Sequence, residues 1–119
     1  MTVKEFYDTI GADYQNVLSR LMKDALVVKF LNKYKDDGSY DKLEKCIKDK
    51  NYEEAFSAAH TLKGLALNLG LSKLGDAASE LTEYLRSGGT KDAAKVEKMM
   101  SSVRTYQKEV LENLKKLKA

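Results

Sequence analysis

The stretch Ala58-Ala59-His60-Thr61-Leu62-Lys63-Gly64 lies in the middle of a helix-patterned segment that runs from Asn51 to Leu69. On an ideal helix, which turns by about 100° per residue, one side of this segment carries only alanines and leucines. These residues are Ala55, Ala59, Leu62, Ala66 and Leu69. Because small side chains allow helices to approach closely, the pattern predicts a buried helix inside an all-α fold.

The other side of the same helix carries the only histidine of the chain, His60. His60 lies roughly 140° and Gly64 roughly 180° from the centre of the apolar stripe, so both are predicted to point outward, one turn apart. Lys63 lies on the flank, at roughly 80°. An exposed imidazole, a nearby cation and a missing side chain together indicate a place where another protein could approach and exchange an anionic group.

Phe56 and Leu67 lie at about 100° and 120° on this helix, outside the apolar stripe. Single exposed apolar residues occur on most protein surfaces, so they need no special explanation. Their position on either side of His60 nevertheless makes them candidates for the apolar part of a docking surface.

The central stretch, followed by Asn68-Leu69-Gly70, resembles the histidine-containing phosphotransfer (HPt) domain of bacterial two-component relays. The family pattern is His-x-Leu-Lys-Gly with a small residue about six positions further on, which is Gly70 here. The similarity is strongest from Tyr52 to Leu85, and the whole chain is similar to the family in size and helical pattern. The resemblance implies an antiparallel up-down four-helix bundle with short additional N-terminal helices.

It also implies that His60 is the phosphoacceptor, that Lys63 neutralises charge on the phosphoryl group, and that Gly64 leaves clearance for a receiver. The implied partners are response-regulator receiver domains, a hybrid histidine kinase, or both. The carrier itself would be a monomer that needs no cofactor, since the Mg²⁺ of the transfer would belong to the receiver.

In the family, a polar side chain on the following helix, commonly a glutamine, holds the second ring nitrogen of the histidine. No glutamine lies between residues 72 and 87 of this chain. Ser79, Thr82 and Glu83 are the candidates for that position, and the sequence does not choose among them.

The rest of the chain also reads as helices joined by short turns, which predicts antiparallel neighbours in one domain, 1–119. Thr2 with Glu5, Asp13, Asn51 with Glu54, and Asp92 are candidate N-terminal caps. We expect the four core helices at roughly 24–36, 51–69, 72–87 and 91–117, and we expect the earlier and shorter helices to flank them. In the last helix, a stripe at a spacing of three and four residues is expected to face inward: Val96, Met99, Val103, Tyr106, Val110 and Leu117.

Composition excludes several classes of protein. The chain has 119 residues and a formal net charge of +3, which is too small and dispersed to indicate nucleic-acid binding. No run approaches the 18 or so apolar residues of a membrane span, so no membrane association is expected. Cys46 is the only cysteine, which fits a reducing compartment and predicts a cytoplasmic location. One histidine and one distant cysteine do not make a metal site.

Two alternatives to a phosphocarrier stay open. The dimerisation domain of a histidine kinase also displays a helical histidine, but there an acidic residue and then a proline typically follow, whereas Thr61 follows here and the chain has no proline. The second alternative is a non-catalytic helical interaction module with an incidental surface histidine. Acid-labile phosphate on the protein would separate a carrier from such a module.

Met1 followed at once by a capped helix favours a free-standing carrier.

Overall fold

Helices form most of the described residues. The computed structural model describes residues 1–117 and contains no strand within them, which confirms the predicted all-α class. Residues 118–119, the end of the expected domain, lie outside the described part. The helices are α1 (Val3–Ile10), α2 (Tyr14–Leu21), α3 (Asp24–Lys35), α4 (Ser39–Lys48), α5 (Tyr52–Asn68), α6 (Ser72–Arg86) and α7 (Ala93–Leu114).

The predicted caps set where helices begin. The Thr2 hydroxyl accepts a hydrogen bond from the Glu5 amide, and the Glu5 carboxylate accepts one from the Thr2 amide, which completes a capping box at α1. At α5 the Asn51 side chain accepts a hydrogen bond from the amide of Glu54. Asp13 and Asp92 cap α2 and α7 in the same way. Each cap satisfies amide groups that the first turn of a helix leaves unpaired.

Gly70 ends α5 and permits a tight hairpin to α6. It adopts a left-handed conformation, with φ of +68°, which other residues rarely take. The Leu71 amide then donates to the Ala66 carbonyl at 2.9 Å, a hydrogen bond typical of glycine-terminated helices. A Cβ atom at Gly70 would also lie 2.8 Å from the Asp13 carbonyl oxygen. The turn therefore requires glycine for both its conformation and its space.

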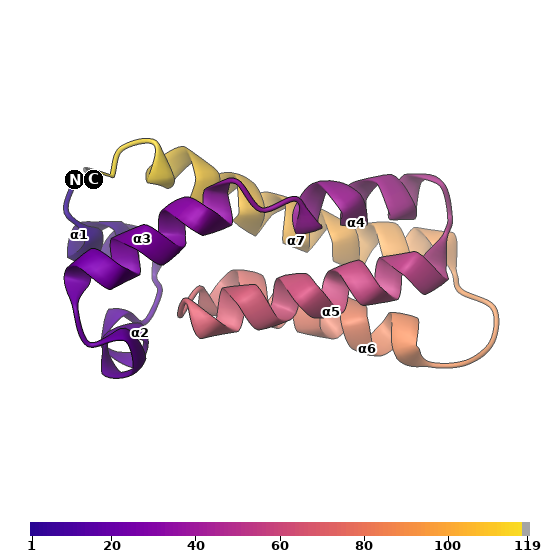
Figure 1. Cartoon of the computed structure of the whole chain (residues 1–119). Coiled ribbons are helices and arrows are strands. Elements are labelled where there is room, and N and C mark those ends of the chain that lie inside the picture. Colours follow the sequence, from indigo (N-terminus) through magenta and orange to yellow (C-terminus); the bar gives the residue numbers. More distant parts are fainter. Residues whose placement is uncertain (118–119) are drawn as a thin grey trace.

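The helices α4, α5, α6 and α7 form a closed ring of neighbours: α4 packs on α5, α5 on α6, α6 on α7, and α7 on α4. Successive helices run in opposite directions, so the ring is an antiparallel up-down four-helix bundle (Figure 1). The short helices α1–α3 gather at one end of the elongated molecule, which measures 44 × 24 × 20 Å.

The fourth core helix differs from the expected one. We expected residues 24–36 in the bundle, but α4 packs along α5, whereas α3 packs on α2, α7 and α1. The expectation followed the apolar pattern of residues 24–36, which is longer than that of α4. Two apolar residues of that pattern, Leu26 and Phe30, are each 37 % exposed in the structure. Both α3 and α4 contact α7, so the two helices share that neighbour.

The inward face of α7 also differs from its expected stripe. The buried residues are Val96, Met100, Val103, Gln107, Val110 and Leu114. Gln107 takes the place expected for Tyr106 because its amide oxygen accepts a hydrogen bond from the buried Tyr34 hydroxyl. Buried polar groups are tolerated when they are paired in this way. A pattern that counts only apolar residues misses such a position.

The N-terminal helices hold the α5–α6 turn through four hydrogen bonds, two of which come from Arg20 and reach the Leu67 and Asn68 carbonyls. The Tyr7 hydroxyl donates to the Leu69 carbonyl at 2.5 Å, and the Asp13 amide donates to the Gly70 carbonyl at 3.3 Å. The Arg20 guanidinium donates to the Asn68 carbonyl at 2.7 Å. Burial raises the pKa of Tyr7, so its hydroxyl stays protonated as a donor. These contacts satisfy carbonyls that the end of α5 leaves unpaired.

Leu62 is fully buried in the bundle, so the Leu62→Ala variant should lose about 2–5 kcal/mol of unfolding free energy through lost burial and the cavity left behind. Urea unfolding followed by circular dichroism measures this. Leu67→Ala is the matched control, because Leu67 is 40 % exposed on the same helix and should cost less. Equal losses in the two variants would mean that Leu62 is not a core residue.

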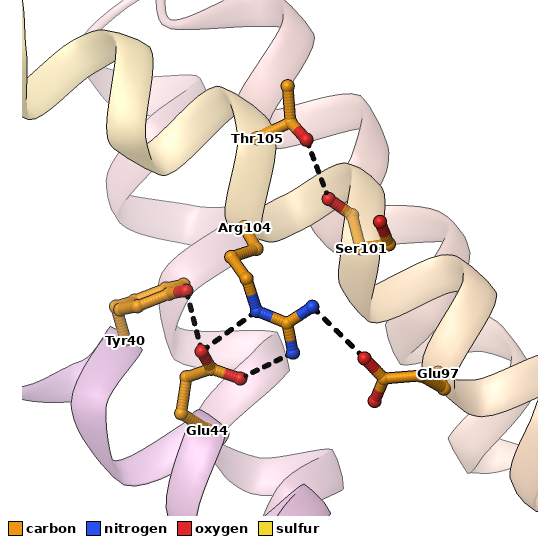
Figure 2. A network of polar contacts seen from close by, with 6 residues as sticks. All are labelled: Tyr40, Glu44, Glu97, Ser101, Arg104 and Thr105. Atoms are coloured by element: carbon orange, nitrogen blue, oxygen red, sulfur yellow. Dashed lines mark hydrogen bonds and ion pairs between the residues drawn. The ribbon is translucent and has the colours of Figure 1, made fainter.

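An ion-pair network ties α4 to α7 (Figure 2). Arg104 donates two hydrogen bonds to the Glu44 carboxylate, at 2.9 and 3.0 Å, and one to Glu97 at 3.0 Å. The Tyr40 hydroxyl donates to the same Glu44 carboxylate at 3.0 Å. The hydrogen bonds from Arg104 lower the pKa of Glu44, while burial raises the pKa of Tyr40 to about 12. Paired donation from one guanidinium fixes the relative position of the two helices.

The network should make stability depend on pH. Because the folded-state pKa of Glu44 is lowered, its contribution is present above the ordinary carboxyl pKa near 4.5 and is lost as pH falls through the folded-state value. Glu44→Gln should therefore cost about 1 kcal/mol or less at pH 7, since both partners are more than a third exposed. Urea unfolding of both proteins should show that difference shrinking below pH 4. A difference that is the same at pH 3 and pH 7 would contradict the assignment.

Within residues 1–117, none of the helices combines the length and apolarity that crossing a bilayer requires.

Candidate functional site

The outer side of α5 carries the predicted site residues. His60 and Gly64 are exposed, while Ala59 and Leu62 on the opposite side are fully buried. This is the placement that the helical pattern predicted. No other helix covers His60 or Gly64, because α5 contacts α4 on one flank and α6 on the other. A partner can therefore reach the imidazole directly from solvent.

Open space lies above Gly64. No atom outside the local helix backbone lies within 4 Å of the position that a Cβ atom would occupy there. Glycine in a helix costs about 1 kcal/mol relative to alanine, and no close contact in this structure requires it. The absent side chain leaves the turn after His60 flat.

Lys63 lies on the flank of α5, half-buried. Within residues 1–117 its ammonium group makes no ion pair and no hydrogen bond. The long flexible stem lets the charge move over several ångströms. This cation is therefore available to an anionic group held at the neighbouring imidazole.

Two contacts fix the register between α5 and α6 beside the site. A Cβ atom at Gly75 would lie 2.4 Å from Leu67 Cδ2, and the Arg86 guanidinium lies 5.3 Å from the centre of the Phe56 ring. His60 is seven residues before Leu67 and four after Phe56. Because α6 runs antiparallel to α5, the residue of α6 beside His60 lies seven positions after Gly75 and four positions before Arg86. Both counts give residue 82.

Position 82 is a threonine whose hydroxyl is already used. Thr82 is fully buried and donates to the Ala78 carbonyl at 2.7 Å. Glu83 is exposed and pairs with Arg86 at 3.4 Å. Ser79 is half-buried and makes no hydrogen bond within the described residues. None of the three polar candidates on α6 donates to or accepts from His60 in this structure.

His60 instead lies against an aromatic ring. The His60 and Phe56 rings are 6.1 Å apart between centroids, and their planes are 18° from parallel. Arg86 lies over the same Phe56 ring, and Glu83 pairs with Arg86. Sequence reasoning placed Phe56 and His60 on neighbouring angles of the helix but did not predict the stack. Arg86 could not be found without the register of α6.

Leu67 is the other predicted docking residue. Its tip covers Gly75 on α6, and 40 % of the residue stays exposed. The small residue on α6 lets Leu67 lie flat across the two helices. Phe56 and Leu67 therefore border the exposed His60–Gly64 face, one toward each end of α5.

Among the described residues, no group of three or more His, Cys, Asp or Glu side chains is arranged to hold a metal ion.

A comparison with protein families identifies the chain. A family model described as the Hpt domain matches residues 15–118, which is most of the sequence. The chain belongs to the Hpt domain family. No curated protein matches the chain, and no solved structure does either. Hpt domains are histidine-containing phosphotransfer modules of phosphorelays, and they are carriers rather than kinases. The family match thus agrees with the resemblance found in the sequence.

Proposed function

We propose that this Hpt domain carries a phosphoryl group on His60 between aspartates of response-regulator receiver domains. The observation that supports this most strongly is that His60 is the only histidine in the sequence and is exposed on α5. A histidine phosphotransfer module needs an accessible imidazole, and this chain has no other. We propose that it acts in the cytoplasm, as a monomer, with receivers or a hybrid histidine kinase as partners.

In the proposed transfer, His60 on α5 is the nucleophile. One nitrogen of the neutral imidazole attacks the phosphorus of an aspartyl phosphate on the receiver. A P–N bond forms as the P–O bond to the aspartate breaks, and the electron pair of that bond leaves with the carboxylate. The phosphorylated ring is then an imidazolium, and it becomes neutral if the second ring nitrogen releases its proton to water. The reverse step delivers the group to the next aspartate, and both steps need an in-line approach.

The neighbouring residues support each part of this step. Lys63 can neutralise charge on the transferring oxygens as a mobile cation. Gly64 gives the receiver clearance, and Phe56 and Leu67 would form the apolar border of the docking surface. We propose that the carrier uses no cofactor of its own, and that the Mg²⁺ of the reaction is brought by the receiver.

Incubation with phosphorylated receivers tests the proposal. The wild-type protein should acquire phosphate that is labile in acid and stable in base, while the receiver loses its own. Absence of such phosphate with every receiver of the same genome would favour a helical interaction module with an incidental histidine.

Lys63→Ala should slow phosphorylation of His60 from a receiver and from the small donor phosphoramidate alike, because the charge acts on the phosphoryl group itself. We expect both rates to fall about ten- to hundredfold. This is less than the effect of removing a charge-stabilising group from a closed active site, since Lys63 acts at an open surface. Initial rates with both donors measure it. A loss confined to the receiver reaction would make Lys63 a docking residue instead.

A further inference from the structure

Free rotation of an exposed imidazole works against transfer between two folded proteins. A histidine ring has two side-chain torsions, and the second has a broad energy profile. A receiver holds its aspartyl phosphate in one place, so the attacking nitrogen must point in one direction. In this structure no polar side chain of α6 supplies that direction, because Thr82 bonds to its own helix and Glu83 pairs with Arg86.

The Phe56 ring supplies the only side-chain interaction of His60 that the structure records among residues 1–117. The two residues are four apart on α5, so their side chains lie one above the other. The ring planes are 18° from parallel, and rotation of the imidazole about its second torsion would break this arrangement. Phe56 is half-buried and packs against the core of the bundle.

Phe56 is itself held from α6. The Arg86 guanidinium lies 5.3 Å from the Phe56 ring centre, within the range of cation–π attraction. Glu83, 3.4 Å from Arg86, limits where the guanidinium can go. These residues therefore form one connected series across the hairpin: Glu83, Arg86, Phe56 and His60.

We propose that Phe56, supported by Arg86, is a positioning residue that orients the His60 ring by stacking, in place of a hydrogen bond from α6. The inference rests on the proposed function of His60, which it deepens. Stacked aromatic pairs contribute interaction energies that correspond to about two- to tenfold in an equilibrium. A loss of that size is therefore expected in the rate of transfer within the complex with a receiver.

Phe56→Leu and Phe56→Tyr test the proposal as a pair. Leucine keeps an apolar side chain but has no ring, and tyrosine keeps the ring. Single-turnover transfer from a phosphorylated receiver should show the maximal rate of Phe56→Leu lowered about two- to tenfold, and that of Phe56→Tyr close to wild type. The half-saturating receiver concentration reports docking separately. Phosphoramidate, which can approach from any direction, should react with all of them at similar rates.

A spectroscopic readout makes the test independent of any partner. His60 is the only histidine, so its ring protons give unambiguous NMR signals. The ring current of the stacked Phe56 should displace these signals in the wild type and in Phe56→Tyr, and Phe56→Leu should remove that displacement. Arg86→Gln should reduce it in part. Phe30→Leu is the matched control, because Phe30 also lies under a cation, Lys33 at 5.4 Å, but on α3.

An unchanged maximal rate in Phe56→Leu, or unchanged His60 signals, would overturn the inference. A rise in the half-saturating concentration alone would also overturn it, since Phe56 would then act only in docking. Failure of the proposed function is a distinct result: the wild type would accept no phosphate from any donor, while the NMR shift would still respond to Phe56.

Discussion

The His60→Gln variant is expected to accept no phosphate from any receiver and none from phosphoramidate. Glutamine has no nucleophilic nitrogen, and no other imidazole in the sequence can replace it. Because His60 is exposed and its side chain makes no hydrogen bond within the described residues, the fold should be almost unaffected, with stability within about 0.5 kcal/mol of wild type.

Two measurements check this expectation. Acid-labile phosphate should be absent after incubation with each donor, and the urea unfolding curve should overlay that of the wild type. Phosphate that still appears in the variant would place the acceptor elsewhere and end the assignment of His60. A loss of several kcal/mol would instead mean that the ring contributes to the packing of the bundle, contrary to its position here.

The Gly64→Gln variant should lose transfer from a receiver by about a hundredfold or more while reacting normally with phosphoramidate. A receiver must bring its aspartate within bonding distance of His60, and its loops must then cross the turn that Gly64 leaves flat. Displacing two reacting groups by about 1 Å can cost a hundredfold in rate. The fold should tolerate the change, because nothing lies within 4 Å of the new Cβ atom and glycine is a poor helix former.

Rates from receiver and from phosphoramidate, measured in parallel, test this. Ser102→Gln is the matched control: Ser102 is exposed on α7, which lies across the bundle from α5, so the same side chain there should leave both rates unchanged. Wild-type transfer by Gly64→Gln would show that no partner packs over this turn. The docking model would then fail even if His60 is the acceptor.

Much of this architecture follows from patterns within single helices. The alanine and leucine stripe of α5 places Leu62 inside and His60 outside, and Asn51 and Gly70 mark where that helix begins and ends. Such features depend on neighbours a few residues apart, which a sequence displays directly. They were enough to predict the helical bundle and the exposed face of the candidate site.

Features that depend on contacts between helices could not be predicted in this way. The packing of α4 rather than α3 along α5 is a contact between helices, and the apolar pattern of either helix alone does not reveal it. Gln107 is buried because Tyr34, 73 residues away, supplies its partner. Arg86 reaches Phe56 only in the register set by the α5–α6 turn. For Gln107 and for Arg86 the deciding partner is distant in sequence.

The packing of α1 bears on how this protein can be cut for experiments. The family match begins at residue 15, after α1, yet Phe6 and Tyr7 of that helix are fully buried and Tyr7 bonds to the end of α5. A fragment trimmed to the match would expose the surfaces that these two rings cover and leave the Leu69 carbonyl unpaired. A fragment prepared for structural work should therefore keep α1 together with the residues of the family match.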